Sequence, residues 1–270
     1  MKNKTYFIFL FILLGVQIQA QDYSIPRLRL EVEGGVNLLF AKMNKPELIR
    51  ESQTYFFDND HDFHCGFVRE SRGIFTYQAA VKLEYVLTKR WAIASGLRFS
   101  FYKATLTSDR DYFLWKVFET ETVTNYVKIN DIYQRNYYLG IPIEIKLYPR
   151  EKDYFVRQYF LVGGTLNFLV ASEKKVVFQN KNMEKYSSAV KKYIVPPNLF
   201  HGNIYLGVGL KIGKSNYPVG NLEVIVPVLT IGQYKKNTFA KITAAPGIGV
   251  RAIFQIPLLK KHLLTYNVLD

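Results

Sequence analysis

The stretch from Tyr138 to Arg150, YLGIPIEIKLYPR, alternates between two kinds of side chain. One set of alternate positions is small, polar or aromatic and includes Glu144 and Lys146. The other set is wholly aliphatic: Leu139, Ile141, Ile143, Ile145 and Leu147. Because successive side chains of a strand point to opposite faces, this pattern predicts a β-strand with one apolar and one polar face. Its apolar face would contact either a protein core or membrane hydrocarbon.

Seven further segments show the same alternation. Each is long enough for a tilted strand to cross a hydrocarbon core, which takes about 9–11 residues, whereas strands of soluble proteins usually have about 5–6. The predicted strands are 27–41, 75–87, 91–105, the stretch 138–150 with a start as early as Tyr126, 154–171, 200–212, 221–230 and 239–255.

The connections between these segments alternate in length. Short, turn-rich connections occur at 88–90, 149–153 and 213–220, and that at 232–237 is intermediate. Long ones occupy 42–74, 106–125 and 172–198. Short periplasmic turns and long outer loops are typical of outer-membrane barrels. We therefore predict an all-β fold, an eight-stranded antiparallel up-and-down transmembrane β-barrel with both mature termini in the periplasm. Pro142, Pro227 and Pro246 fall inside predicted strands, and one or more of them is expected to mark a bulge.

The N-terminus has the layout of a secretory signal peptide. Lys2 and Lys4 precede an apolar run from Tyr6 to Val16, and Ala20 supplies a small residue before the expected cleavage point. The alternative is a retained N-terminal anchor. The expected organisation is a signal peptide at 1–20, the barrel at 21–255 and a periplasmic C-terminal tail at 256–270.

Composition narrows the class further. After the signal segment no run of eighteen apolar residues occurs, which excludes a helical membrane protein. The net charge is +14. Because the chain is expected to be exported, its acidic neighbours would be lipid head groups and lipopolysaccharide, and no nucleic-acid partner is expected. Cys65 is the one cysteine, so the fold must hold without an internal disulfide.

The polar faces of the predicted strands combine charged residues with glycine and alanine. An eight-stranded barrel is only wide enough to be filled by its own side chains, and buried charges require partners. We predict a network of paired charges that plugs the interior, made of Arg29, Glu31, Glu33, Lys82, Glu84, Arg98, Glu144, Lys146, Lys211, Glu223 and Arg251. Alternation alone also fits a soluble, lipocalin-like secreted barrel with its apolar face inside.

Four of these segments resemble the small outer-membrane barrels of the PorT-like group of Bacteroidota. The similarity covers roughly Asp22 to Gln255 and rests on LEVEGGVNLLF, YLGIPIEIKLYP, FLVGGTLNFLV and ITAAPGIGVRAIF. The resemblance implies an eight-stranded barrel in the outer membrane and supplies no catalytic residues. One member of the group takes part in a protein secretion system.

Two sets of residues could carry chemistry. The segment 56–67 gathers Asp58, Asp60, His61, Asp62, His64 and Cys65, which are suitable ligands for a divalent cation, although their spacing matches no zinc or EF-hand signature. A lipid A-modifying barrel enzyme would need a serine, a histidine and an acid near the outer rim, for which His201 and serines 172, 187 and 188 are the candidates. Solvated loop residues and a strand-end histidine are the plainer interpretations.

Aromatic residues are abundant, with 20 Tyr and 20 Phe. Those near strand ends are expected to form interfacial girdles: Tyr77, Tyr85, Trp91, Tyr102, Tyr137, Tyr148, Tyr154 and Phe254. The lysine pairs 174–175, 191–192 and 235–236 fall in predicted outer loops, where they would either meet lipopolysaccharide phosphates or simply form a solvated face.

The sequence thus predicts a non-enzymatic outer-membrane barrel without a cofactor. Its role would be structural or would depend on loops that bind other envelope proteins, including an accessory role in protein secretion. The alternatives are a lipid A-modifying enzyme, a soluble barrel that binds an apolar ligand, and a narrow channel.

Overall fold

The computed structural model describes residues 27–43, 48–50, 68–70, 73–108, 112–118, 124–232, 240–242 and 247–258. Several predicted features lie outside these ranges. They are the signal peptide, the segment 56–67, Lys235, Lys236, Pro246 and the tail beyond Leu258.

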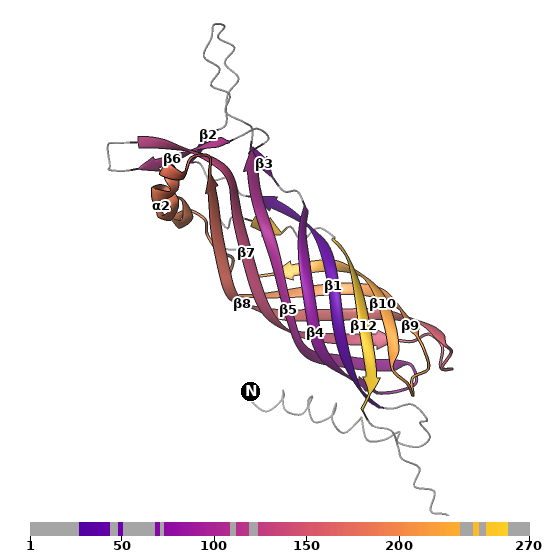
Figure 1. Ribbon diagram of the computed structural model, residues 1–270. Coiled ribbons are helices and arrows are strands. Elements are labelled where there is room, and N and C mark those ends of the chain that lie inside the picture. Colours follow the sequence, from indigo (N-terminus) through magenta and orange to yellow (C-terminus); the bar gives the residue numbers. More distant parts are fainter. Residues whose placement is uncertain are drawn as a thin grey trace, which may run out of the picture.

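Eight long strands form a closed antiparallel ring (Figure 1). In ring order they are β1 (Leu28–Met43), β4 (Gly73–Val86), β5 (Trp91–Ser108), β7 (Thr124–Leu147), β8 (Val156–Phe178), β9 (Phe200–Ile212), β10 (Val219–Ile231) and β12 (Ile248–Pro257). The ring closes where β12 pairs with β1, with Phe254 opposite Val32. This closure confirms the predicted eight-stranded barrel.

Four short strands bring the described sheet to 12 strands: β2 (Ile49–Arg50), β3 (Val68–Glu70), β6 (Phe113–Phe118) and β11 (Ala240–Ile242). All pair at the same end of the barrel. There β8 continues to Phe178 and is followed by the 3-10 helix η1 (Lys181–Tyr186) and the short helix α2 (Ser187–Lys192). The long connections predicted at 106–125 and 172–198 are therefore largely folded.

The opposite end of the barrel carries the short turns. Leu258 N donates to the carbonyl oxygen of Leu28 at 3.0 Å, so the first and last described strands meet at that end. Gly213 opens the turn between β9 and β10 with a φ of +117°, a backbone conformation that residues with a side chain rarely adopt. Within the described ranges, no helix is long and apolar enough to cross a membrane.

The two described strand prolines behave differently. The β9–β10 register shifts between Pro227 and Leu229, which confirms the expectation that at least one of these prolines marks a bulge. No register shift accompanies Pro142, since Ser95 pairs with Ile143 and Arg98 with Gly140 in the same register, although the two pairs between them are missing. The carbonyl oxygen of Pro142 accepts a hydrogen bond from Ser95 Oγ at 2.8 Å. The proline thus interrupts the ladder with β5 locally, while its pairing with Thr165 on β8 continues.

The ring is apolar outside and charged inside. Outward side chains such as Val81, Leu97 and Ile143 are 50–57 % exposed, whereas Lys82, Glu144 and Lys146 are at most 1 % exposed. Soluble barrels bury their apolar face, so the lipocalin-like alternative is wrong for the described strands. An apolar outer band around a polar interior defines a transmembrane β-barrel.

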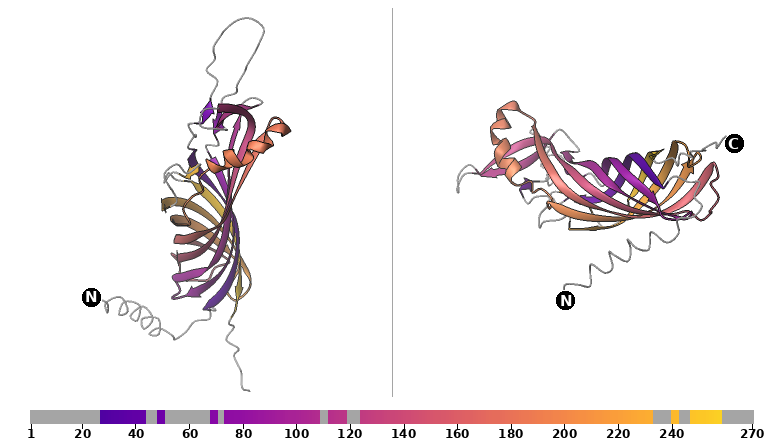
Figure 2. Two further views of the ribbon diagram at one scale, coloured as in Figure 1. Left: turned by 90° about the vertical axis from the view of Figure 1, so that its left-hand side faces the viewer. Right: turned by 90° about the horizontal axis from the view of Figure 1, so that it is seen from below.

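The two faces exchange character part-way along the strands. On β5 the outward residues change from Leu97, Phe99 and Phe101 to Lys103 and Thr105, and the inward residues change from charged to apolar. Beyond this point the inward side chains form a hydrophobic core: Ala104, Leu106, Phe113, Trp115, Val117, Val127, Ile129, Ile132, Val190 and Ile194. This core continues into the end of the barrel through Ile74, Tyr102 and Tyr138. We call this part the extension, namely 103–108 of β5, β6, 124–135 of β7, 171–178 of β8, η1 and α2 (Figure 2).

Aromatic rings mark the change of faces. Phe101 stacks on Tyr77 and Tyr137, with ring centroids 5.0 and 6.0 Å apart, on the outer surface. Tyr102 and Tyr148, however, face inward and are 2 % and 4 % exposed, so their assignment to girdles is wrong. Strand alternation places Tyr102 on the inner face beside Tyr138.

Candidate functional site

All eleven charged residues predicted for the interior lie inside the barrel, each at most 3 % exposed. Their side chains come from seven of the eight ring strands, β1, β4, β5, β7, β9, β10 and β12. The arrangement follows from alternation, because each of these residues occupies an inward position of its strand. The register of the strands decides which of these charges come into contact.

Glu144 lies at the centre of the network. Its Oε1 accepts hydrogen bonds from Arg251 at 2.6 Å, from Arg98 at 2.7 Å and from the Tyr205 hydroxyl at 2.6 Å. Its Oε2 accepts from Lys82 Nζ at 2.5 Å. One carboxylate thus joins cations from three other strands.

A second carboxylate shares the same cations. Glu33 lies 2.6 Å from Lys82, 3.0 Å from Arg98 and 3.4 Å from Arg251. Because Glu33 and Glu144 both contact all three, the five groups form one cluster across the barrel. Such shared pairing offsets part of the large cost of removing each charge from water.

A lower cluster lies nearer the short turns. Lys146 bridges Glu31 and Glu84, and Arg29 Nη1 lies 2.7 Å from Glu84. Gln255 Nε2 donates to both carboxylates, at 2.5 Å to Glu31 and 3.0 Å to Glu84. Lys82 lies 3.1 Å from Glu31 and so links this cluster to the upper one.

Arg251 extends the charge network to Glu223 on β10. Its Nη2 lies 2.7 Å from Glu223, which also accepts a hydrogen bond from the Tyr159 hydroxyl at 2.6 Å. Tyr159 and Tyr205 were not among the residues predicted for the network, although the alternation places both at inward positions. In the structure each tyrosine pairs with a glycine on the neighbouring strand.

These glycines make room for the rings. Gly209 pairs with Tyr159, and a Cβ on Gly209 would lie 2.3 Å from that ring. Gly163 pairs with Tyr205, and a Cβ there would lie 2.5 Å from its ring. The small residues on the polar faces therefore allow long and aromatic side chains to fill a narrow interior.

Lys211 stands apart from the main network. Its Nζ donates to Ser215 Oγ, which in turn donates to Asp153 at 2.8 Å. Nearby, Arg157 donates to the carbonyl oxygens of Lys89 and Arg150, both at 2.7 Å. This group ties the three short turns together.

The residues proposed for lipid A chemistry are not gathered into a site. His201 is 4 % exposed and packs edge-on against Tyr138, with centroids 4.6 Å apart, inside the barrel. Ser172 donates to Asn136 at 2.7 Å, while serines 187 and 188 begin α2. Among the described residues, no hydrogen bond or ring contact joins His201 to any of these serines.

The lysine pairs have different positions. Lys174 and Lys175 lie on β8 in the extension, and Lys191 and Lys192 end α2. Lys174 Nζ donates to the Lys191 carbonyl at 3.2 Å, and partial burial lowers the pKa of Lys174.

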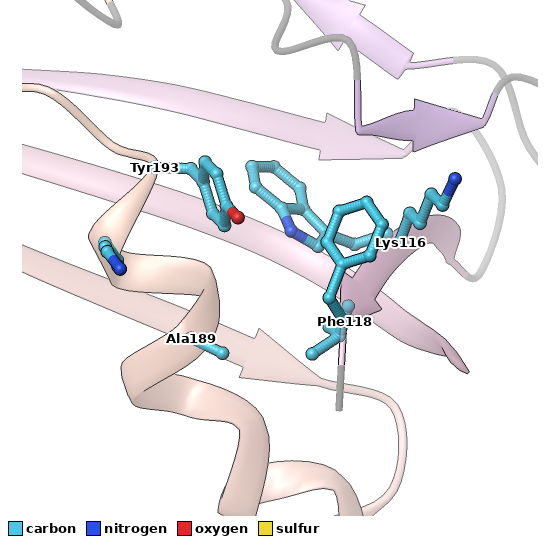
Figure 3. A pocket seen from close by; sticks show the side chains of 7 residues that line it. Lys116, Phe118, Ala189 and Tyr193 are labelled. Atoms are coloured by element: carbon cyan, nitrogen blue, oxygen red, sulfur yellow. The ribbon is translucent and has the colours of Figure 1, made fainter. Parts of the chain in front are cut away.

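Between β6 and α2 the extension also contains a pocket of about 130 Å³ (Figure 3). The described ranges hold no cluster of three or more His, Cys, Asp or Glu suited to a metal ion.

No protein-family model and no curated sequence matches this chain. Among solved structures it is similar to the outer membrane protein OprG of Pseudomonas aeruginosa, with 8 % identity, a TM-score of 0.44 and coverage of 86 % of this chain and 97 % of that one. It is also similar to Ail, the attachment invasion locus protein of Yersinia pestis, crystallised with the heparin analogue sucrose octasulfate. There the identity is 12 %, the TM-score 0.31 and the coverage 86 % and 100 %. Because both TM-scores are below 0.5, no function is inferred for this chain from these similarities.

Proposed function

We propose that this protein is an integral outer-membrane barrel with a closed interior, which acts without catalysis by holding the extension outside the cell for a partner to bind. Both mature termini then lie in the periplasm, beside the short turns. The location is supported by the apolar outer band. From Tyr137 to Leu147, β7 rises about 33 Å along its length, or about 25 Å at a tilt near 40°. That height matches the apolar band of an outer-membrane barrel.

The main support for a closed interior is the contact of Glu144 with three cations from other strands. Glu33 joins the same cations from β1, so charged side chains cross the barrel in a continuous chain. A channel at this level would require buried pairs to separate, which is expensive in free energy. We therefore favour a structural, non-conducting barrel over the narrow channel.

The extension supplies the interaction role. It is built on a hydrophobic core that contains none of the barrel charges, and it has a polar outer surface bearing lysines. A folded, basic surface outside the membrane suits phosphate groups of lipopolysaccharide or an acidic face of another envelope protein. The accessory role in secretion implied by the PorT-like resemblance would use this same surface.

The first test is fractionation of the native host, with heated and unheated gel lanes. We expect recovery in the outer membrane and slower migration after boiling. Reconstituted protein should give no discrete conductance steps in a planar bilayer, and protease added to intact cells should cut the extension. Recovery in the soluble periplasm would overturn the membrane location, and stepwise conductance would overturn the closed interior.

The non-catalytic part has its own test. Deletion of the gene should leave the mass spectrum of lipid A unchanged. A mass change restored by the wild-type gene but not by a His201→Ala variant would favour the enzyme instead. Cross-linking from lysines of α2 in intact cells would identify a protein partner.

A further inference from the structure

The pocket between β6 and α2 has features of a binding site for a small ligand. Figure 3 shows Phe118 on the strand, with Tyr193 and Ala189 on the helical segment across the space, while the ammonium group of Lys116 points away from that segment. Trp115 and Lys192 complete the part of the lining used here. The two sides come from segments more than 70 positions apart in the sequence, so only the folded extension forms this pocket.

Its walls combine aromatic rings with cations. Phe118 is 47 % exposed and Tyr193 43 %, which is unusual for rings beside a well-packed hydrophobic core. Lys116 Nζ lies 4.9 Å from the centre of the Phe118 ring. Lys116 and Lys192 are both cations, and none of the described residues that line the pocket is acidic. An anionic ligand is therefore favoured.

Trp115 forms a buried wall of the pocket. Its side chain is fully buried, and its Nε1 has no hydrogen-bond partner among the described residues. Because this nitrogen is itself enclosed, the indole contributes apolar ring surface to the pocket and no hydrogen bond to a ligand.

We propose that this pocket binds one six-membered sugar ring that carries a carboxylate or a phosphate. A cavity of about 150 Å³ accommodates benzene, so a pocket of about 130 Å³ has room for a single ring. The ring packs against Phe118 and Tyr193, and its acidic group pairs with Lys192. The half-exposed walls leave a bound ring partly hydrated, which suits a hydroxylated ring better than an aromatic acid.

This inference deepens the proposed binding role of the extension and rests on it for the source of the sugar, either lipopolysaccharide or a free sugar acid. Binding itself can be measured on purified protein. The chain has two tryptophans, and Trp91 lies at the far end of the barrel. In a Trp91→Phe variant of the full-length protein in detergent, all tryptophan fluorescence comes from Trp115.

The experiment titrates this variant with glucuronate, glucose 1-phosphate, uncharged glucose and lipopolysaccharide micelles. We expect a saturable change in Trp115 emission with at least one anionic probe and none with glucose at equal concentration. A response to lipopolysaccharide at far lower sugar concentration identifies it as the source, and a response to the free anions alone identifies a free sugar acid.

Three further changes locate the binding. Lys192→Gln should weaken it about 2–5-fold, the range expected for one exposed ion pair. Ala189→Phe fills the pocket and should abolish it, while Lys175→Gln, which removes an exposed charge elsewhere on the extension, should leave it unchanged. Heat-modifiable migration verifies the fold of each variant. If Ala189→Phe does not fold, the affinity of Lys192→Gln alone tests the proposed pocket. The binding proposal would be refuted if no anionic probe changed the Trp115 emission, or if Lys192→Gln and wild type bound with equal affinity. Neither result would affect the fractionation test.

Discussion

Lys82 Nζ lies 2.5 Å from Glu144 Oε2, although β5 runs between the strands that carry them. Lys82 pairs across the ladder with Gly96, and Glu144 pairs with Ala94. Because both intervening positions are small, the two long side chains meet over β5 inside the barrel. The contact is thus a product of barrel curvature and of small residues on one strand.

Removal of the central carboxylate should be costly. Glu144→Gln keeps the shape but leaves Lys82, Arg98 and Arg251 with one fewer anion, so we expect a loss of about 3–5 kcal/mol in unfolding free energy. Urea titration in detergent, followed by the fraction of unheated folded band, measures it. The control Glu173→Gln affects an exposed pair 4.0 Å from Arg135 and should change stability by about 0–1 kcal/mol. Equal stability of Glu144→Gln and wild type would show that the network does not hold the barrel.

The glycines opposite the interior tyrosines should not tolerate a methyl group. Gly209→Ala places a Cβ against the Tyr159 ring, and overpacking of this kind costs about 1–3 kcal/mol. Gly34→Ala is the matched control, since a Cβ there meets nothing within 4 Å. The same urea assay compares the two, and a Gly209→Ala variant as stable as the control would contradict the tight interior.

The change of faces on β5 should define the upper membrane boundary. Leu97→Arg puts a charge in the apolar band and should destabilise the barrel by about 2–4 kcal/mol in lipid. Thr105→Arg, also outward but beyond Phe101, should cost little because that position lies in water. Folding yields into lipid vesicles distinguish them. If both variants fold equally well, the boundary is misplaced.

The extension and the barrel should lose structure separately. Val190 is fully buried against the extension core, so Val190→Asp buries an unpaired charge there. We expect much faster proteolysis of the extension on intact cells, while the heat-modifiable shift of the barrel persists. Ser188→Asp, at an exposed position of the same helix, is the control. Loss of the heat-modifiable shift in Val190→Asp alone would show that the two parts fold as one.

The period-two pattern by itself determined the ring, because a strand fixes which residues share a face. It identified the eight strands and the common face of all eleven charges, while strand length and the order of long and short connections indicated that this face lies inside. It failed at 106–125 and 172–198, where the inward face becomes apolar and the outward face polar. Those stretches resembled loops because the sequence does not indicate where a strand leaves the membrane and its faces exchange solvent.

Only the tertiary structure decided which charges meet and what stands above them. Glu144 contacts Lys82, Arg98 and Arg251 because register and closure bring four strands to one level, and alternation carries no information about level. The same holds for Trp115 and Tyr193, which become neighbours of one pocket only when α2 packs on β6. Faces are a local property of the chain, whereas contacts across a closed barrel depend on every register around the ring.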